Sequence, residues 1–208
     1  LSQDTEWEMA LFREMIPLKK KWCSHPIEDK PKVLDLAARA GAWYVYQAVF
    51  DTSDYIRERI KRYHDHGIAV EGTILLGLDD HTEDGIRRLI DFLMEIDLDL
   101  AEFTVLTPFP HTRAFDDLKR QNRIFSFDWD EYSADKVVYT PKHMTPEKLQ
   151  KLLDYAWDTF YADQPQEIKM FNLFQKVVRK EIADNTYRPR NRRLGKKAFG
   201  KAIDPDGP

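Results

Sequence analysis

The sequence predicts an α/β fold: the later strands of a partial (β/α) TIM-like barrel, followed by a mostly helical C-terminal extension. Three observations favour this fold. Three apolar segments of strand length, rich in β-branched and aromatic residues, follow one another along the chain. The intervals between them carry the apolar spacing of helices and have short connections, which is typical of parallel strands joined by helices. After residue 112 this alternation gives way to helical patterns.

The first forty residues predict two helices around one short strand. Apolar residues at every third or fourth position indicate a helix over residues 7–21, with Pro17 marking its end. Residues 21–27 form a possible short strand. A second helix is expected over residues 33–39, closed by Gly41 at its C-terminus.

The next segments predict the sheet. Residues 43–50, 69–77 and 100–106 are expected to be adjacent parallel strands, buried on both faces. A helix over residues 54–66 connects the first two. A second amphipathic helix, capped by Thr82 and continuing to about residue 96, connects the last two.

The rest of the chain predicts the extension. Helices are expected over residues 113–122, 145–161 and 165–184, and a possible strand over residues 136–139. We therefore divide the chain into a barrel part (1–112), a helical extension (113–185) and a basic tail (186–208). Few large apolar residues occur in the tail, so we expect it to be poorly packed.

Composition excludes several classes of protein. With 42% hydrophobic and 33% charged residues, the chain can form a packed core and is not expected to be disordered. No apolar run approaches the roughly 20 residues that a membrane helix needs. Net charge is −4, but residues 176–201 hold ten basic and two acidic residues. That basic segment is either a solvated tail or an arm for nucleic acid, and both readings stay open.

The single cysteine and the histidines limit metal and disulfide chemistry. Cys23 alone cannot form a disulfide scaffold or a metal cage of three or four cysteines, and it indicates a reducing, cytoplasmic compartment. We expect it to be a small buried side chain. His64 and His66 are two apart on a predicted helix and face away from each other, so no metal site is expected. The chain also lacks the G-x-S-x-G, P-loop and G-x-G-x-x-G motifs.

Three polar residues stand within otherwise apolar predicted strands: Gln47, Glu71 and Thr73. Burying such a group without a partner costs on the order of a few kcal/mol, so each needs a partner. Neighbouring residues or water at an edge or lumen position are one explanation, and a ligand held inside the barrel is the other. Glu71 and Thr73 are two apart and share one face of their strand. We expect all three side chains to point into the barrel lumen.

Two motifs at the carboxyl ends of the predicted strands, where parallel α/β folds bind ligands, carry a family resemblance. The sequence GTILLGLDDHTED (residues 72–84), an amphipathic helix and then LAEFTVLTPFPHT (residues 100–112) resemble the C-terminal half of the radical SAM barrel. They look most like the class that also has an N-terminal cobalamin (B12)-binding domain. Residues 128–132, 137–139 and 141–147 resemble that class too, and the resemblance covers roughly residues 11–161.

The chain departs from the family pattern at three places. His111 stands where the family commonly has glycine, and the connection after Phe50 is short. The cluster-binding motif C-x3-C-x2-C is absent, and Cys23 is not a remnant of it. Because the chain also begins at Leu1 rather than at a methionine, we expect a fragment whose natural N-terminus lies upstream.

The resemblance implies a function for the complete protein. In this family a [4Fe–4S] cluster reductively cleaves S-adenosylmethionine to a 5′-deoxyadenosyl radical, which abstracts hydrogen from a substrate, here unknown; cobalamin is a further candidate cofactor. The fragment would supply part of the wall around S-adenosylmethionine and substrate, and we expect it to bind no cofactor alone. No catalytic residue and no metal ligand is assigned. The implied cofactor-binding positions are Gln47, Glu71, Thr73, Gly77, Asp79 and Pro108.

Two other functions stay open. The chain could be a non-catalytic binding module derived from the barrel, or part of an RNA-modifying enzyme that uses the basic tail. The expected partners are a small-molecule substrate and the upstream half of the same barrel. Membrane and nucleic acid are not expected as partners.

Overall fold

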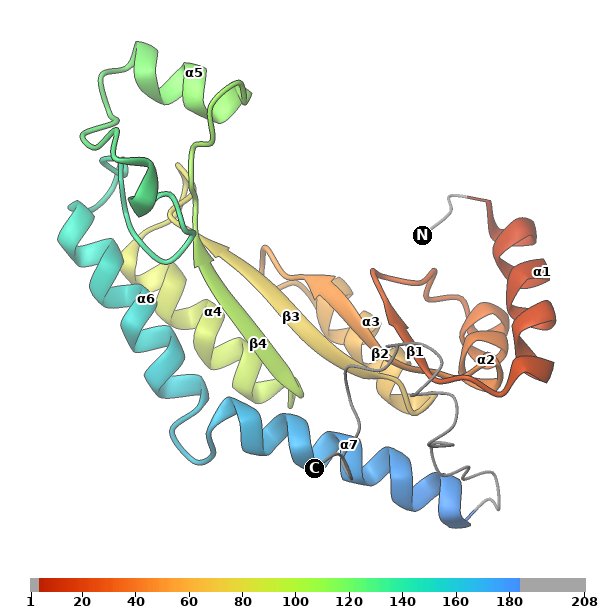
Figure 1. Ribbon diagram of the computed structural model, residues 1–208. Coiled ribbons are helices and arrows are strands. Elements are labelled where there is room, and N and C mark those ends of the chain that lie inside the picture. The colour runs from red at the N-terminus through yellow and green to blue at the C-terminus, as the bar shows by residue number, and fades with distance from the viewer. Residues whose placement is uncertain (1–3, 184–208) are drawn as a thin grey trace, which may run out of the picture. The chain divides into compact units, whose positions relative to one another are not determined.

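The computed structural model in Figure 1 describes residues 4–183 of the 208-residue chain. The chain divides into two compact units, residues 1–170 and residues 171–208. The last helix, α7 (Gln166–Ala183), begins in the first unit and continues into the second. The tail expected at residues 186–208 lies outside the described residues, and the boundary at residue 112 stays a prediction.

Four parallel strands form one sheet in the first unit. They are β1 (Trp22–Ser24), β2 (Ala42–Ala48), β3 (Ala69–Leu76) and β4 (Leu100–Val105), and their order in the sheet is their order in the chain. The prediction of three adjacent parallel strands is therefore confirmed, with the short first strand added at one edge. An α/β sheet with helical connections and a helical extension is the partial barrel that the sequence predicts.

Helices connect successive strands, and further helices come after the last strand in the chain. Figure 1 shows α3 and α4 on the same side of the sheet, with α6 alongside α4. Side-chain oxygens of Ser53, Thr82 and Thr145 accept hydrogen bonds from the first-turn N–H groups of α3, α4 and α6, and the sequence predicts the cap at Thr82. The helices of the first unit are α1 (Thr5–Met15), α2 (Pro31–Ala40), α3 (Asp54–Asp65), α4 (Glu83–Glu95), α5 (Arg113–Arg120) and α6 (Pro146–Phe160), with 3₁₀ turns at Ile16–Leu18 and Trp129–Glu131.

Alternation along the strands gives the sheet two different faces. Val45, Ile74 and Phe103 are at most 2% exposed and belong to the core shared with the helices. Phe103 packs edge-on against Trp157 and Phe160 of α6, at ring-centroid distances of 5.6 and 5.9 Å. The residues at the intervening positions, which include Tyr46, Ala48, Glu71, Thr73 and Glu102, lie on the opposite face, called the open face below.

The outer edge of β4 is covered. The hydroxyl of Tyr161 accepts a hydrogen bond from Ala101 N (3.0 Å) and donates one to Ala101 O (2.7 Å). The N–H of Val105 donates to Ala134 O at 2.8 Å. These contacts use main-chain groups that a further strand would need, so the sheet ends at β4.

The extension contains no strand where residues 136–139 predict one. Only an isolated antiparallel bridge joins Ile124 and Tyr139. Main-chain bonds from Phe125 N to Val138 O (3.1 Å) and from Thr140 N to Arg123 O (2.8 Å) flank this bridge, while the side chain of Gln150 in α6 accepts from Val137 N and donates to Asp135 O. In the described part of the chain, no helix has the length and apolar character required to span a membrane.

Candidate functional site

A pocket of about 520 Å³ lies on the open face of the sheet. All four strands contribute to its lining, because the open-face positions of neighbouring strands stand side by side. Thr73 is opposite Glu102 in the β3–β4 register, and Ala48 is opposite Thr73 in the β2–β3 register. The lining residues are Cys23, Ser24, His25, Pro26, Tyr46, Ala48, Thr73 and Glu102.

Glu71 and Thr73 lie on the open face, as their spacing predicts. Thr73 lines the pocket directly, and Glu71 is 7% exposed. Burial raises the pKa of the Glu71 carboxyl, and the nearby charge of Glu102 raises it further. The open face therefore combines a hydroxyl, a carboxylate and a carboxyl group that holds its proton more tightly than usual.

Gln47 does not join them, and the prediction that it points into the lumen is wrong. It is buried, but alternation places it with Val45 and Val49 on the helix face of β2. Arg59 Nε of α3 donates a hydrogen bond to Gln47 Oε1 at 2.9 Å. Gln47 Nε2 donates to Ala48 O at 2.8 Å, so the amide is satisfied within the protein.

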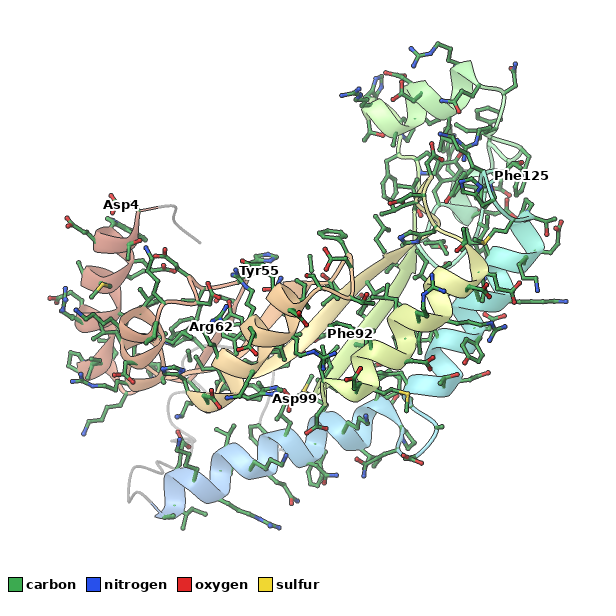
Figure 2. The ribbon with its side chains drawn as sticks, turned by 180° about the vertical axis from the view of Figure 1, so that it is seen from behind. Asp4, Tyr55, Arg62, Phe92, Asp99 and Phe125 are labelled. Atoms are coloured by element: carbon green, nitrogen blue, oxygen red, sulfur yellow. The ribbon has the colours of Figure 1, made fainter. Side chains whose placement is uncertain are left out.

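Arg59 belongs to a polar cluster between α3 and the loop before α2. Its guanidinium donates to Ile27 O (3.2 Å) and approaches Asp29 to 3.6 Å. Arg62 pairs with the same aspartate, and Tyr63 donates its hydroxyl proton to Ile27 O. Figure 2 shows Arg62 on α3, on the helix side of the sheet. This cluster holds the segment after β1 in place.

The loop after β3 contains Gly77 and Asp79, and the extension holds both. Gly77 has φ +86°, and its carbonyl accepts a hydrogen bond from the hydroxyl of Tyr139. Asp79 Oδ1 is 2.8 Å from Arg123 Nη2, and Asp79 Oδ2 is 2.6 Å from Lys142 Nζ. Hydrogen bonding to Arg123, and then to Lys142, lowers the pKa of Asp79.

Pro108 follows β4 at the same end of the sheet and is buried beside Thr107. The chain then turns at His111, whose φ is +65°. That left-handed conformation is the one glycine adopts most easily, which accounts for a family glycine at this position. Gly77, Asp79 and Pro108 are thus brought to the carboxyl ends of β3 and β4, while Glu71 and Thr73 lie along the open face.

A second pocket of about 250 Å³ lies where β2 and β3 end, beside the first turn of α4. Asp51, Asp80, His81 and Arg88 are among its lining residues. Within the described residues, Nδ1 of His81 is buried without a hydrogen-bond partner. Burial lowers the pKa of this histidine.

Cys23 and the two histidines of α3 lie in different surroundings. Cys23 is exposed, so the prediction of a small buried side chain is wrong: β1 is an edge strand and its side chain faces the pocket. His64 Nε2 lies 2.8 Å from Asp99 Oδ2 rather than near His66. Across residues 4–183, no three His, Cys, Asp or Glu side chains are grouped so that they could hold a metal ion.

No protein-family model matches the chain, but curated proteins resemble it in sequence. It is 30% identical over 158 residues to a bacteriochlorophyllide d C-12(1)-methyltransferase of Chlorobaculum tepidum, a match that covers 68% of this chain and 34% of the relative. It is 31% identical over 104 residues to an uncharacterized methyltransferase of Pyrococcus horikoshii, covering 50% and 23%. It is 27% identical over 93 residues to an anaerobic magnesium-protoporphyrin IX monomethyl ester cyclase of Cereibacter sphaeroides, covering 45% and 15%. The chain spans about a third of the first relative and less of the others.

Two solved structures of the radical S-adenosylmethionine methyltransferase TsrM from Kitasatospora setae are also similar, each at 17% identity over 54% of this chain. The structure with tryptophan and a SAM analogue has a TM-score of 0.49 and is covered to 27%; the one with cobalamin and a [4Fe–4S] cluster has a TM-score of 0.48 and is covered to 26%. The superfamily named for these two solved structures is the one that the sequence motifs of this chain resemble.

The residues of this chain do not fit the cluster of a radical SAM protein. A [4Fe–4S] cluster with one open iron takes three thiolates from the protein, and this chain has a single cysteine. On the open face, Thr73 and Glu102 can pair with hydroxyl and ammonium groups of a ligand. Sequence reasoning missed Glu102, Arg123 and Tyr139 as neighbours of these positions. The motif over residues 137–147 was the signal for the last of them.

Proposed function

We propose that this chain forms the later strands of a radical SAM barrel, and that the complete protein is a radical SAM enzyme acting on a small molecule. The observation that supports it most is the open face, where a pocket lined by Thr73 and Glu102 crosses all four strands, and the buried Glu71 lies on the same face. In this proposal the pocket is one wall of the site for S-adenosylmethionine and substrate. When bound, S-adenosylmethionine and a [4Fe–4S] cluster supply a 5′-deoxyadenosyl radical.

Each predicted position has a proposed role. Thr73, with Glu102, holds hydroxyl and ammonium groups of a ligand, and Glu71 lies beside them on the open face, where burial raises the pKa of its carboxyl. Pro108 closes the wall where β4 ends. Gln47 acts through Arg59 by fixing β2 to α3, and Gly77 and Asp79 fix the loop after β3.

The upstream half of the barrel is the proposed partner of the β1 edge. The strands are added in chain order, and the β4 edge is occupied by Tyr161 and Ala134. A preceding strand would therefore pair with β1. The same upstream part would supply the C-x3-C-x2-C cysteines that this chain lacks.

Two of the relatives are named as methyltransferases, so methyl transfer is the reaction class we propose first. Cobalamin is a proposed further cofactor, held outside this chain. Cytoplasmic location stays a proposal that rests on the single cysteine.

Anaerobic reconstitution with iron and sulfide tests the proposal. The complete gene product should show [4Fe–4S] absorbance and cleave S-adenosylmethionine under reducing conditions, and the 208-residue chain should show neither. Cluster binding by the chain alone would overturn the ligand argument. A complete sequence without the three cysteines would favour the non-catalytic binding module.

The RNA-modifying alternative has its own test. Affinity for RNA should fall steeply with salt and disappear when residues 176–201 are deleted, if that segment is an RNA arm. Affinity that is weak and independent of this deletion would remove the alternative.

A further inference from the structure

The loop after β3 is held by three side chains from one segment of the extension. Arg123 and Lys142 each engage a different oxygen of Asp79, and Tyr139 donates a hydrogen bond to the carbonyl of Gly77. These three residues come from within 20 positions of one another in the chain. They approach the carboxyl end of β3 together.

The segment that carries them is itself tied into one unit. Thr140 N donates to Arg123 O at 2.8 Å, and Arg123 Nε donates to Thr140 O at 2.7 Å. The isolated bridge between Ile124 and Tyr139 closes the same loop of chain. Tyr139 is fully buried, so the segment is anchored in the core while Lys142 reaches outward.

The packing around Gly77 leaves no space for a side chain. A Cβ at this residue would fall on the hydroxyl of Tyr139 and within van der Waals overlap of Leu149. The main chain of the loop therefore lies directly against the extension. The position of the loop therefore depends on the positions of Tyr139, Arg123 and Lys142.

The three charged side chains of this contact, Asp79, Arg123 and Lys142, differ in their exposure to solvent. The Arg123 side chain is 12% exposed, whereas those of Asp79 and Lys142 are 46% and 49% exposed. An isolated exposed pair contributes little, but here one carboxylate is shared by two cations, and one of them is shielded from water. The Lys142 contact is therefore the part that salt can screen.

We propose that Arg123, Tyr139 and Lys142 are positioning residues that fix the loop from Gly77 to His81 at the carboxyl end of β3. Asp79 then influences ligand binding through the loop rather than by touching the ligand. The effect on the loop stands on the structure alone. The effect on S-adenosylmethionine rests on the proposed function.

Hydrogen exchange of the 208-residue chain tests the effect on the loop. The N–H of His81 donates to Leu78 O at 3.0 Å, so its exchange rate reports whether the loop keeps its shape. In Asp79→Asn and Lys142→Met we expect amides of residues 78–82 to exchange about fivefold faster or more. Lys142→Arg, which keeps the charge, should restore the wild-type rate.

A matched control is the exposed pair of Lys61 and Asp65 on α3, whose atoms are 2.7 Å apart. Asp65→Asn should leave the rates of residues 78–82 unchanged. Equal rates in Lys142→Met and wild type would overturn the proposal. So would acceleration spread evenly over β2, β3 and α4, because that pattern indicates general destabilisation.

The complete protein tests the effect on the ligand. In Lys142→Met we expect the KM for S-adenosylmethionine to rise about fivefold while kcat changes less than twofold, with recovery in Lys142→Arg. Unchanged KM would overturn the link to the ligand. A complete wild-type protein that does not cleave S-adenosylmethionine would instead count against the proposed function, and the exchange rates would still decide the effect on the loop.

Discussion

Gly77 is a residue at which both backbone geometry and packing restrict the sequence. Its φ of +86° disfavours any L side chain, and Tyr139 and Leu149 occupy the space of a Cβ. We expect Gly77→Ala to lower the free energy of unfolding by about 2 kcal/mol or more, measured by urea denaturation. Gly85→Ala is the control, because this glycine lies in α4 without a positive φ, and its Cβ would lie 3.1 Å from the hydroxyl of Thr82, a tight contact that a shift of a few tenths of an ångström relieves. Equal losses in the two variants would contradict the packing argument.

Two histidines should titrate on opposite sides of the usual value of 6.5. The hydrogen bond to Asp99 raises the pKa of His64, so its stabilisation is present below 6.5 and is lost as pH rises through the folded value. Burial lowers the pKa of His81, so protonation of the unfolded chain costs stability as pH falls below 6.5. NMR titration of the imidazole protons measures both values.

A variant at Asp99 separates the two effects. Asp99 Oδ2 also accepts the N–H of Val70 at 2.9 Å, and Figure 2 shows this residue just before β4. Asp99→Asn removes the charge but can still accept a hydrogen bond. We expect the pKa of His64 to fall toward 6.5 while that of His81 stays low. A fall in both would mean that the variant had changed the fold.

Side-chain direction was predictable only where spacing alone decides it. Glu71 and Thr73 share a face because they are two apart, and the structure confirms this. Gln47 is on another strand, and its apolar neighbours on both sides give no sign of which face holds the helices. The partner that holds Gln47 on the helix face is Arg59, which lies twelve residues away in the chain. Cys23 was assigned to the core from its residue type, but it lies on the edge strand.

At the level of elements, Tyr161 connects the end of α6 to the edge of β4. Its hydroxyl pairs both the N–H and the carbonyl of Ala101, a residue with no exposed surface. We expect Tyr161→Phe to cost about 1–3 kcal/mol of unfolding free energy, because a buried main-chain N–H loses its partner. Chemical denaturation followed by circular dichroism measures it.

A second hydroxyl deletion serves as the control. Tyr46→Phe removes a hydroxyl from the wall of the open-face pocket, and we expect a loss within about 0.5 kcal/mol. Tyr161→Phe should also associate more at high concentration, since an uncovered edge can pair with another chain. A monomeric variant with wild-type stability would show that Tyr161 does not protect the edge.

Elements were predicted well where periodicity is strong and short-range. The strands β2, β3 and β4 and the helices α3, α4 and α6 lie within a few residues of their predicted bounds. The extension was harder, because Phe125, labelled in Figure 2, and its neighbours follow no period. Residues 136–139 have the composition of a strand, but the N–H of Val137 donates to the side chain of Gln150 rather than to a neighbouring strand. Such a long-range side-chain contact leaves no local signal.

At the level of the whole molecule, Cys23 reports on the β1 edge. Its thiol is exposed in this chain. We expect a maleimide to label it in the native 208-residue chain at a rate within about threefold of that in urea. In the complete protein, a strand paired with β1 should slow labelling of the Cys23 peptide, followed by mass spectrometry, by about tenfold or more. Equal rates in the two proteins would mean that the upstream residues do not cover β1.

Strand order has a consequence for how the molecule is made. Each strand pairs with the one that precedes it in the chain, so its partner has always left the ribosome before it. No described strand needs a later strand in order to pair, and only one helical connection separates each strand from its preceding partner. We therefore expect the sheet to grow strand by strand during synthesis. The contact of Tyr161 with Ala101 then forms after the last strand is in place, and it ends growth of the sheet on that side.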